Sequence, residues 1–146
     1  MSSPTDSELT SVDFVAHHDH GILVVEPLGS RAEHEDWDVS AHGAHLEADS
    51  LFVAVLPGME GTVTTSVRAI SEPQSAADGL ERVFEGRLEV PSRVLLIGDS
   101  DRNIEIRLPM RSGVVDVSVS VDEIGFASRA RVVLREIDAL ATASVF

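Results

Sequence analysis

The stretch Val115-Asp116-Val117-Ser118-Val119-Ser120-Val121 alternates strictly between apolar and polar side chains. Successive side chains of a β-strand point to opposite faces of the sheet, so this pattern predicts a strand with one buried and one solvated face. The four valines would form the buried face. The stretch therefore favours an antiparallel sheet that is packed on one side.

Short runs of the same character recur along the chain, bounded by Pro, Gly, Asp or Ser, and no long amphipathic helix interrupts them. They cover residues 12–16, 21–26, 41–47, 51–56, 61–70, 83–90, 94–97, 104–108, 114–121 and 130–137. Short strands at such regular spacing are typical of an all-β protein. We therefore expect an antiparallel β-sandwich or jelly roll of about 8–10 short strands, which spacing alone does not separate from a small barrel.

Two of the connections between these runs predict hairpins. Residues 12–16 and 21–26 are separated by a polar turn at His17-His18-Asp19-His20, and residues 41–47 and 51–56 flank Ala48-Asp49-Ser50. A length of 146 residues suits one domain that buries enough surface to fold without stabilising cross-links. We expect a single domain over residues 1–146, with residues 1–10 flexible.

The chain carries 25 acidic residues against 11 basic ones, all of them arginine, and its formal net charge is -14. Binding to nucleic-acid backbones is driven by Lys and Arg that displace counterions, so we expect no direct binding to nucleic acid. An anionic membrane surface would repel the chain as well. A basic protein partner suits this charge better, because opposite potentials speed encounter.

The chain contains no cysteine, which excludes disulfides, thiolate metal sites and thiol nucleophiles. Its N-terminal residues lack the basic and apolar regions of a secretory signal. The longest apolar run, residues 51–57, is far shorter than the roughly 20 residues that span a bilayer. These features predict a cytoplasmic protein.

Charge and histidine are concentrated in the first third of the chain. Residues 1–50 carry a net charge of -10, whereas residues 51–100 carry -3 and residues 101–146 carry -1. All six histidines also lie in this first third: His17, His18, His20, His34, His42 and His45. We therefore expect the functional surface at this end of the chain.

The histidines suggest a transition-metal site, because imidazole is the commonest protein ligand for such ions. The candidate ligands are His18, His20, His42 and His45. On a strand, His18 and His20 would share a face. Two other interpretations stay open: the histidines decorate a solvated turn, or they form a pH-responsive patch, since their protonation would move the charge from -14 toward -8.

Nucleophilic catalysis has little support, since the chain lacks a Gly-x-Ser-x-Gly elbow and no pattern ties a serine to a histidine and an acid. Carboxylate pairs such as Asp36 with Asp38, or Asp99 with Asp101, could bind calcium or act as acid and base, although such pairs are more often turn residues. We assign no catalytic residue.

Trp37 is the only tryptophan of the chain and stands among four acids. A lone tryptophan can pack against the sandwich or serve as an aromatic anchor in an interface, and both interpretations stay open. The candidate partner-binding residues are Glu33, Glu35, Asp36, Trp37 and Asp38.

Several short segments carry a resemblance to a known family. They are Phe84-Glu85-Gly86-Arg87-Leu88-Glu89-Val90-Pro91-Ser92, then Leu96-Ile97-Gly98-Asp99, then Ile104-Glu105-Ile106 with Pro109 and Gly113. Together with Asp36-Trp37-Asp38 upstream and Val115-Asp116-Val117 downstream, they resemble the competence protein J family over residues 37–137. The resemblance implies an inhibitor of a DNA-entry nuclease, and hence no catalytic residues.

We expect a non-enzymatic, acidic binding protein that inhibits or regulates a basic partner such as a nuclease. One alternative is a metal-dependent β-sandwich enzyme that uses the histidine cluster, with a transition metal as its cofactor. The other is a structural or oligomerising module without catalysis, which would form homo-oligomers through an exposed strand edge.

Overall fold

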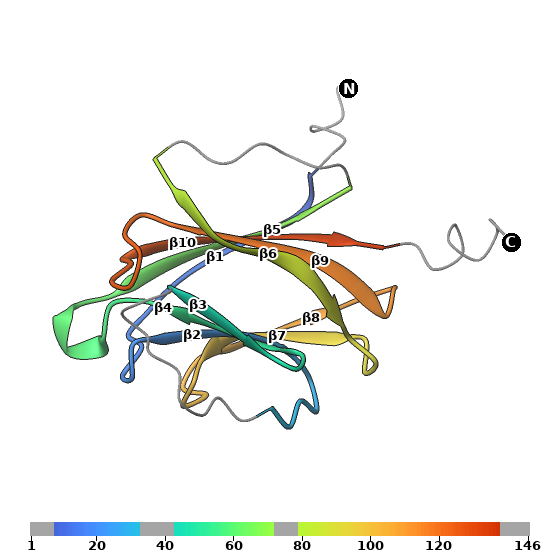
Figure 1. The fold of residues 1–146 in the computed structure, drawn as a ribbon, viewed down its shortest axis with the longest axis horizontal. Helices are drawn as coiled ribbons and strands as arrows, with labels where there is room; N and C mark the ends of the chain where they lie inside the picture. The colour runs from blue at the N-terminus through green and yellow to red at the C-terminus, as the bar shows by residue number, and fades with distance from the viewer. Residues whose placement is uncertain (1–7, 33–42, 72–78, 138–146) are drawn as a thin grey trace, which may run out of the picture.

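Two five-stranded β-sheets pack face to face in the computed structural model, which describes residues 8–32, 43–71 and 79–137 (Figure 1). Within these ranges the elements are ten strands and one short 3-10 helix, η1 (Gly58–Glu60). The all-β prediction is therefore confirmed, and the two open layers make the fold a sandwich. No helix in the described ranges is long and apolar enough to cross a membrane.

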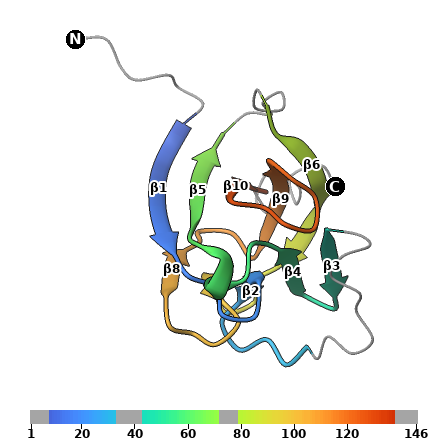
Figure 2. The same cartoon turned by 90° about the vertical axis from the view of Figure 1, so that its left-hand side faces the viewer.

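Sheet 1 has the strand order β1-β5-β10-β9-β6. Its strands are β1 (Glu8–Ala16), β5 (Val63–Ile70), β10 (Arg129–Glu136), β9 (Val114–Val121) and β6 (Glu81–Glu89). Sheet 2 has the order β3-β4-β2-β7-β8. Its strands are β3 (Ala44–Glu47), β4 (Ser50–Ala54), β2 (Ile22–Pro27), β7 (Val94–Asp99) and β8 (Glu105–Pro109). In Figure 2, β1 and β8 lie at one side of the sandwich and β6 and β3 at the other.

The hairpin predicted for residues 12–16 and 21–26 is wrong, because the two strands belong to different sheets. β1 pairs with β5, whereas β2 pairs with β4 and β7. The polar segment between them crosses from one sheet to the other, with His18 bridged to Pro57 and Gly21 at a φ of +67°. Both strands are apolar on their inner positions, so separate sheets bury both inner faces against each other.

The second predicted hairpin is confirmed. β3 and β4 pair antiparallel up to Glu47 opposite Ser50, so that Ala48 and Asp49 form the tight turn. Ala48 has a φ of +53°, in the left-handed region that such two-residue turns require.

One pairing was not predicted: β5 and β10 run parallel at the centre of sheet 1, with Val67 opposite Val132. Every other pair of neighbouring strands is antiparallel. Parallel neighbours require a crossover connection. Here the chain from β5 to β10 runs by way of β6, then β7 and β8 of sheet 2, and then β9.

The core lies between the sheets and consists mostly of valine and leucine. The four valines of the alternating stretch in β9 are at most 1% exposed, which confirms the predicted buried face. They pack with Leu134 and Val132 of β10 and with Leu23, Val25 and Ile97 of sheet 2. Burial of each such side chain stabilises the fold by about 1.5–3 kcal/mol.

Gly98 allows the close approach of β7 to the turn before β8. A Cβ atom at this position would collide with the carbonyl oxygen of Ile104, which is backbone and has no room to move. We expect Gly98→Ala to lower the free energy of unfolding by about 3 kcal/mol. Urea denaturation monitored by circular dichroism measures the change. Gly113→Ala is the matched control, because its Cβ would lie 3.8 Å from the nearest atom; equal losses in both variants would contradict the prediction.

Candidate functional site

The outer face of sheet 2, which is turned away from sheet 1, has an apolar floor. Val24 of β2 pairs with Phe52 of β4, and Leu96 of β7 lies beside them. Val24 and Leu96 are only 5% and 4% exposed although they alternate with core residues. Sheet 2 therefore buries apolar side chains on both faces.

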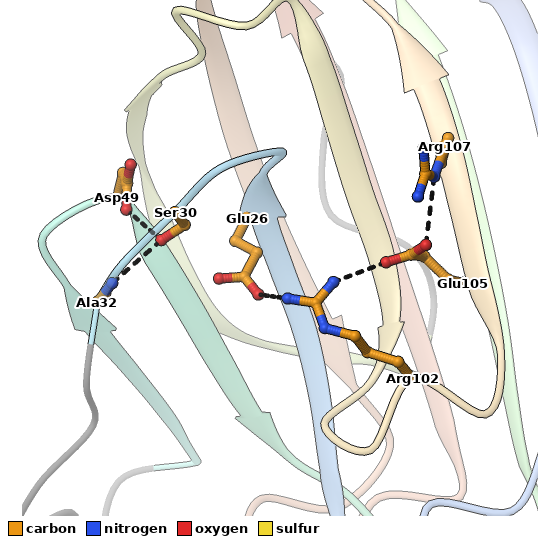
Figure 3. Close-up of polar contacts among 7 residues, drawn as sticks. All are labelled: Glu26, Ser30, Ala32, Asp49, Arg102, Glu105 and Arg107. Carbon is orange, nitrogen blue, oxygen red and sulfur yellow. Dashed lines mark hydrogen bonds and ion pairs between the residues drawn. The ribbon is translucent and has the colours of Figure 1, made fainter.

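Charged side chains frame this floor (Figure 3). Arg102, in the loop between β7 and β8, donates from Nη1 to Glu105 Oε1 at 2.8 Å, and its Nη2 lies 3.6 Å from Glu26 Oε1. Arg107 donates from Nε to the other oxygen of Glu105 at 3.2 Å. Glu26 and Glu105 are thereby neutralised locally, so they offer little free negative charge to a partner.

A cavity of about 50 Å³ lies beneath these ion pairs, lined by the apolar floor and by Asp99 and Ser100. A space of this size holds a water molecule or a few, far less than a substrate requires.

Ser30 fixes the chain where it leaves β2 (Figure 3). Its hydroxyl donates to Asp49 Oδ1 at 2.6 Å and accepts a hydrogen bond from the amide of Ala32 at 3.4 Å. After residues 33–42, which the structure does not describe, the carbonyl of Gly43 accepts a hydrogen bond from the amide of Ala54 at 2.8 Å. The chain therefore leaves and re-enters the described structure against sheet 2.

The candidate partner-binding residues fall between these two anchors. Glu33, Glu35, Asp36, Trp37 and Asp38 lie outside the described residues, so the interpretation of Trp37 as core or as anchor stays open. The flanking residues Ala32 and Gly43, which the structure does describe, both contact sheet 2 or its loops.

The structure does not bring the described histidines into one cluster. His18 is fully buried and donates from Nδ1 to the carbonyl of Ile22 at 3.1 Å. The side chain of His20 is 65% exposed, and its Nδ1 lies 2.7 Å from Asp101 Oδ2. The two would share a face only on a strand, and residues 17–21 form a crossing between the sheets instead.

His45 lies on β3, with its Nε2 3.6 Å from Glu47 Oε2, and His42 lies outside the described residues. Within residues 8–32, 43–71 and 79–137, no three His, Asp or Glu side chains are grouped closely enough to hold a metal ion. A transition-metal site that includes His42 stays a prediction.

Burial lowers the pKa of His18 below its ordinary value of 6.5, and this outweighs the hydrogen bond to Ile22 and the charges of Asp99 and Asp19, which favour protonation. Its Nε2 is buried without a hydrogen-bond partner among the described residues. His18 is therefore a neutral core residue whose protonation opposes folding.

Asp99 and Asp101, the predicted carboxylate pair, make two separate contacts. Asp99 is 4% exposed and accepts a hydrogen bond on Oδ1 from the amide of Ile104 at 3.0 Å. Asp101 pairs with His20. The contact between Arg102 and Glu26 was not predicted, because these residues are far apart in the sequence and nothing in either neighbourhood indicates the other.

No family model matches the chain, and no curated protein sequence does either. Two solved structures share its fold. ComJ, inhibitor of the DNA degrading activity of NucA, from Bacillus subtilis, superposes with a TM-score of 0.64 at 10% identity over 89% of this chain and 97% of its own. The protein described as Crocagin biosynthetic gene J has a TM-score of 0.53 at 11% identity, over 88% and 96%. The resemblance to the competence protein J family is thus confirmed at the level of the fold.

We expect the stability of the protein to fall as pH drops below 6.5, in part through His18. Because its pKa is lower in the folded state, the unfolded state binds the extra proton, so stability is fully present above pH 6.5 and is lost below it. The loss is at most about 1.4 kcal/mol per pH unit for one proton. Urea denaturation between about pH 8 and pH 5 measures this slope.

His18→Asn retains a donor for Ile22 and removes the titration, so the slope of this variant should be shallower than that of the wild type. A wild-type slope in His18→Asn would refute the assignment.

Proposed function

We propose that the chain is an acidic, non-enzymatic binding protein that inhibits a DNA-degrading nuclease. The observation that carries this proposal is the fold shared with ComJ, an inhibitor of the DNA degrading activity of NucA, over nearly the full length of both chains. The resemblance over residues 37–137 supports the same function from the sequence.

Electrostatics supplies the physical basis for such inhibition. A nuclease must offer a basic channel to the phosphates of DNA, and a compact protein with a charge of -14 competes for the same channel. Opposite potentials accelerate the encounter of such partners and make it sensitive to salt.

The geometry of sheet 2 indicates which acids are available to the partner. Glu26 and Glu105 are engaged by Arg102 and Arg107 and contribute little. Glu47, on the edge strand β3, has a side chain that is 50% exposed. Residues 33–38 carry four more acids and join the chain between two anchors on the same sheet. We propose that the inhibitory surface includes Glu47 at this edge of sheet 2, together with the acids of residues 33–38.

Amide substitution of the four acids Glu33, Glu35, Asp36 and Asp38 tests the electrostatic part of the proposal. We expect the variant to inhibit NucA, or the nuclease of the source cell, at least about tenfold less strongly, mainly through slower association. Added salt should slow association of the wild type and affect the variant less. Stopped-flow association rates and a plasmid-degradation assay measure both effects.

A matched control removes four exposed carboxylates elsewhere: Glu60, Glu81, Glu89 and Glu123 are replaced by Gln. This control loses the same charge, so it should retain inhibition if residues 33–38 are the contact. Equal loss of inhibition in both variants would mean that only the net charge matters, and not the position of the acids. Absence of inhibition of any nuclease tested would overturn the proposal. A stoichiometric transition metal bound through His18 and His20 in untagged protein would instead favour the metal-dependent enzyme.

Trp37→Ala tests the aromatic anchor. If the ring is seated in the partner, its removal weakens the complex about 30-fold, as expected for an interface hot spot worth about 2 kcal/mol. The melting temperature should then stay at the wild-type value. A lowered melting temperature with unchanged affinity would assign Trp37 to the core.

A further inference from the structure

The outer face of sheet 1 differs in charge from the rest of the chain. Six of the eleven arginines occupy its outward positions: Arg68, Arg82, Arg87, Arg129, Arg131 and Arg135. Its outward carboxylates are Asp13, Glu85, Glu89 and Asp116. Asp122, which directly follows β9 and accepts a hydrogen bond from the amide of Arg129, adds a fifth carboxylate. The described charges of this face therefore sum to +1, in a chain whose net charge is -14.

The register of β10 explains why the arginines share a face. Ala130, Val132 and Leu134 are buried in the core, so the residues between them point away from it. Arg131 stands at the centre of the sheet, opposite Ser66 of β5 and Ser120 of β9. Its closest cross-strand neighbours are therefore small hydroxyl side chains.

Four of the six arginines are engaged within the face. Arg87 Nε and Arg135 Nη2 donate to the two oxygens of Asp116 at 3.0 and 2.9 Å. Burial alone would raise the pKa of Asp116, but the hydrogen bonds from Arg135 and Arg87 outweigh it and the pKa is lowered, so this carboxylate stays ionised between them. Ion pairs also join Arg68 to Asp13 and Arg82 to Glu85.

The other two arginines keep their side-chain donors available. Neither Arg129 nor Arg131 forms a side-chain hydrogen bond or ion pair with the described residues. A guanidinium presents five N–H donors in a planar fork that matches a carboxylate or phosphate group. Arg129 and Arg131 can therefore bind an anion without breaking an ion pair within the face.

A hollow of about 340 Å³ lies on the same face, and two carboxylates, Glu85 and Asp116, and two arginines, Arg87 and Arg135, are among its lining residues. Its floor includes the small side chains of Ser118 and Val133, and Arg87 and Arg135 stand on its wall with Asp116 between them. The volume falls within the range of about 300–1,000 Å³ that is typical of ligand sites. The hollow has room for side chains of a bound segment.

The composition of the face favours a polypeptide over a nucleic acid. None of the described outward side chains of sheet 1 is aromatic, since Phe14 and Phe84 pack against the core, so bases find no stacking platform. Outward positions of a strand repeat at about 6.6–6.8 Å, which is also the spacing of alternate side chains in an extended acidic segment.

We propose that the outer face of sheet 1 binds an extended acidic segment of a protein partner, whose carboxylates pair with Arg129 and Arg131 while the neighbouring side chains occupy the hollow beside Arg87 and Arg135. This surface lies on the opposite side of the sandwich from the proposed inhibitory edge of sheet 2 (Figure 1). The proposal does not depend on nuclease inhibition.

Fluorescence anisotropy with a labelled peptide of about twelve alternating Glu and Ser residues tests this surface. At low ionic strength the full chain should bind this peptide, and added salt should weaken the complex. Arg131→Gln should weaken binding about tenfold through loss of a charge-assisted hydrogen bond. The melting temperature of Arg131→Gln should match the wild type, because no described residue pairs with this side chain.

Arg111→Gln is the matched control, since Arg111 is exposed in the loop between β8 and β9 and its loss removes the same charge. Binding by this variant should stay within about twofold of the wild type. Three results would overturn the proposal: no binding of the acidic peptide at low salt, equal weakening by Arg111→Gln, or tighter binding of single-stranded oligothymidylate than of the peptide. A Gln-Ser peptide, which lacks the carboxylates, should not bind.

Discussion

Burial of two apolar sheet faces against each other determines which of the described strand side chains face the core and which face solvent. The four alternating valines of β9 and Val132 of β10 pack in the same core as Leu23, Val25 and Ile97 of sheet 2, and all of these are essentially inaccessible to water. A slip of one residue in any of these strands would turn its apolar set to the solvent, at a cost of several kcal/mol. The register is therefore fixed, and with it the set of outward side chains that meet solvent and partners.

The two outer faces follow from this constraint in different ways. On sheet 1 most of the described outward positions are polar, with Val15 and Val133 among the exceptions, so the face is solvated and carries the arginines. On sheet 2 the central strands β2 and β7 are apolar on both faces, as Val24 and Leu96 show. The loop that carries Arg102 frames the second apolar layer with ion pairs. One side of the sandwich thus presents the face of sheet 1 that carries the arginines. The other side carries sheet 2, against which the chain leaves the described structure at Ala32 and re-enters it at Gly43.

The histidines illustrate how far local sequence predicts a site. Their grouping within the first 45 residues suggested one cluster, and the sequence contains no signal of burial that separates His18 from His20. Burial depends on Pro57 and on β2, which meet His18 only after the chain has crossed between the sheets. The same crossing explains why the first predicted hairpin failed, whereas the turn at Ala48 and Asp49, which closes between adjacent strands, was predicted correctly.

The sequence by itself determined the strands, their buried faces and the excess of acid near residues 33–38, because alternation, turn residues and charge are local properties of the chain. Only the tertiary structure decided that β1 pairs with β5 and not with β2, that β5 and β10 run parallel, and that Arg102 reaches Glu26. It also decided that six arginines, spread from Arg68 to Arg135, share one face. These relations join residues distant in the chain, and their free energy comes from burial between whole sheets, which no local pattern records.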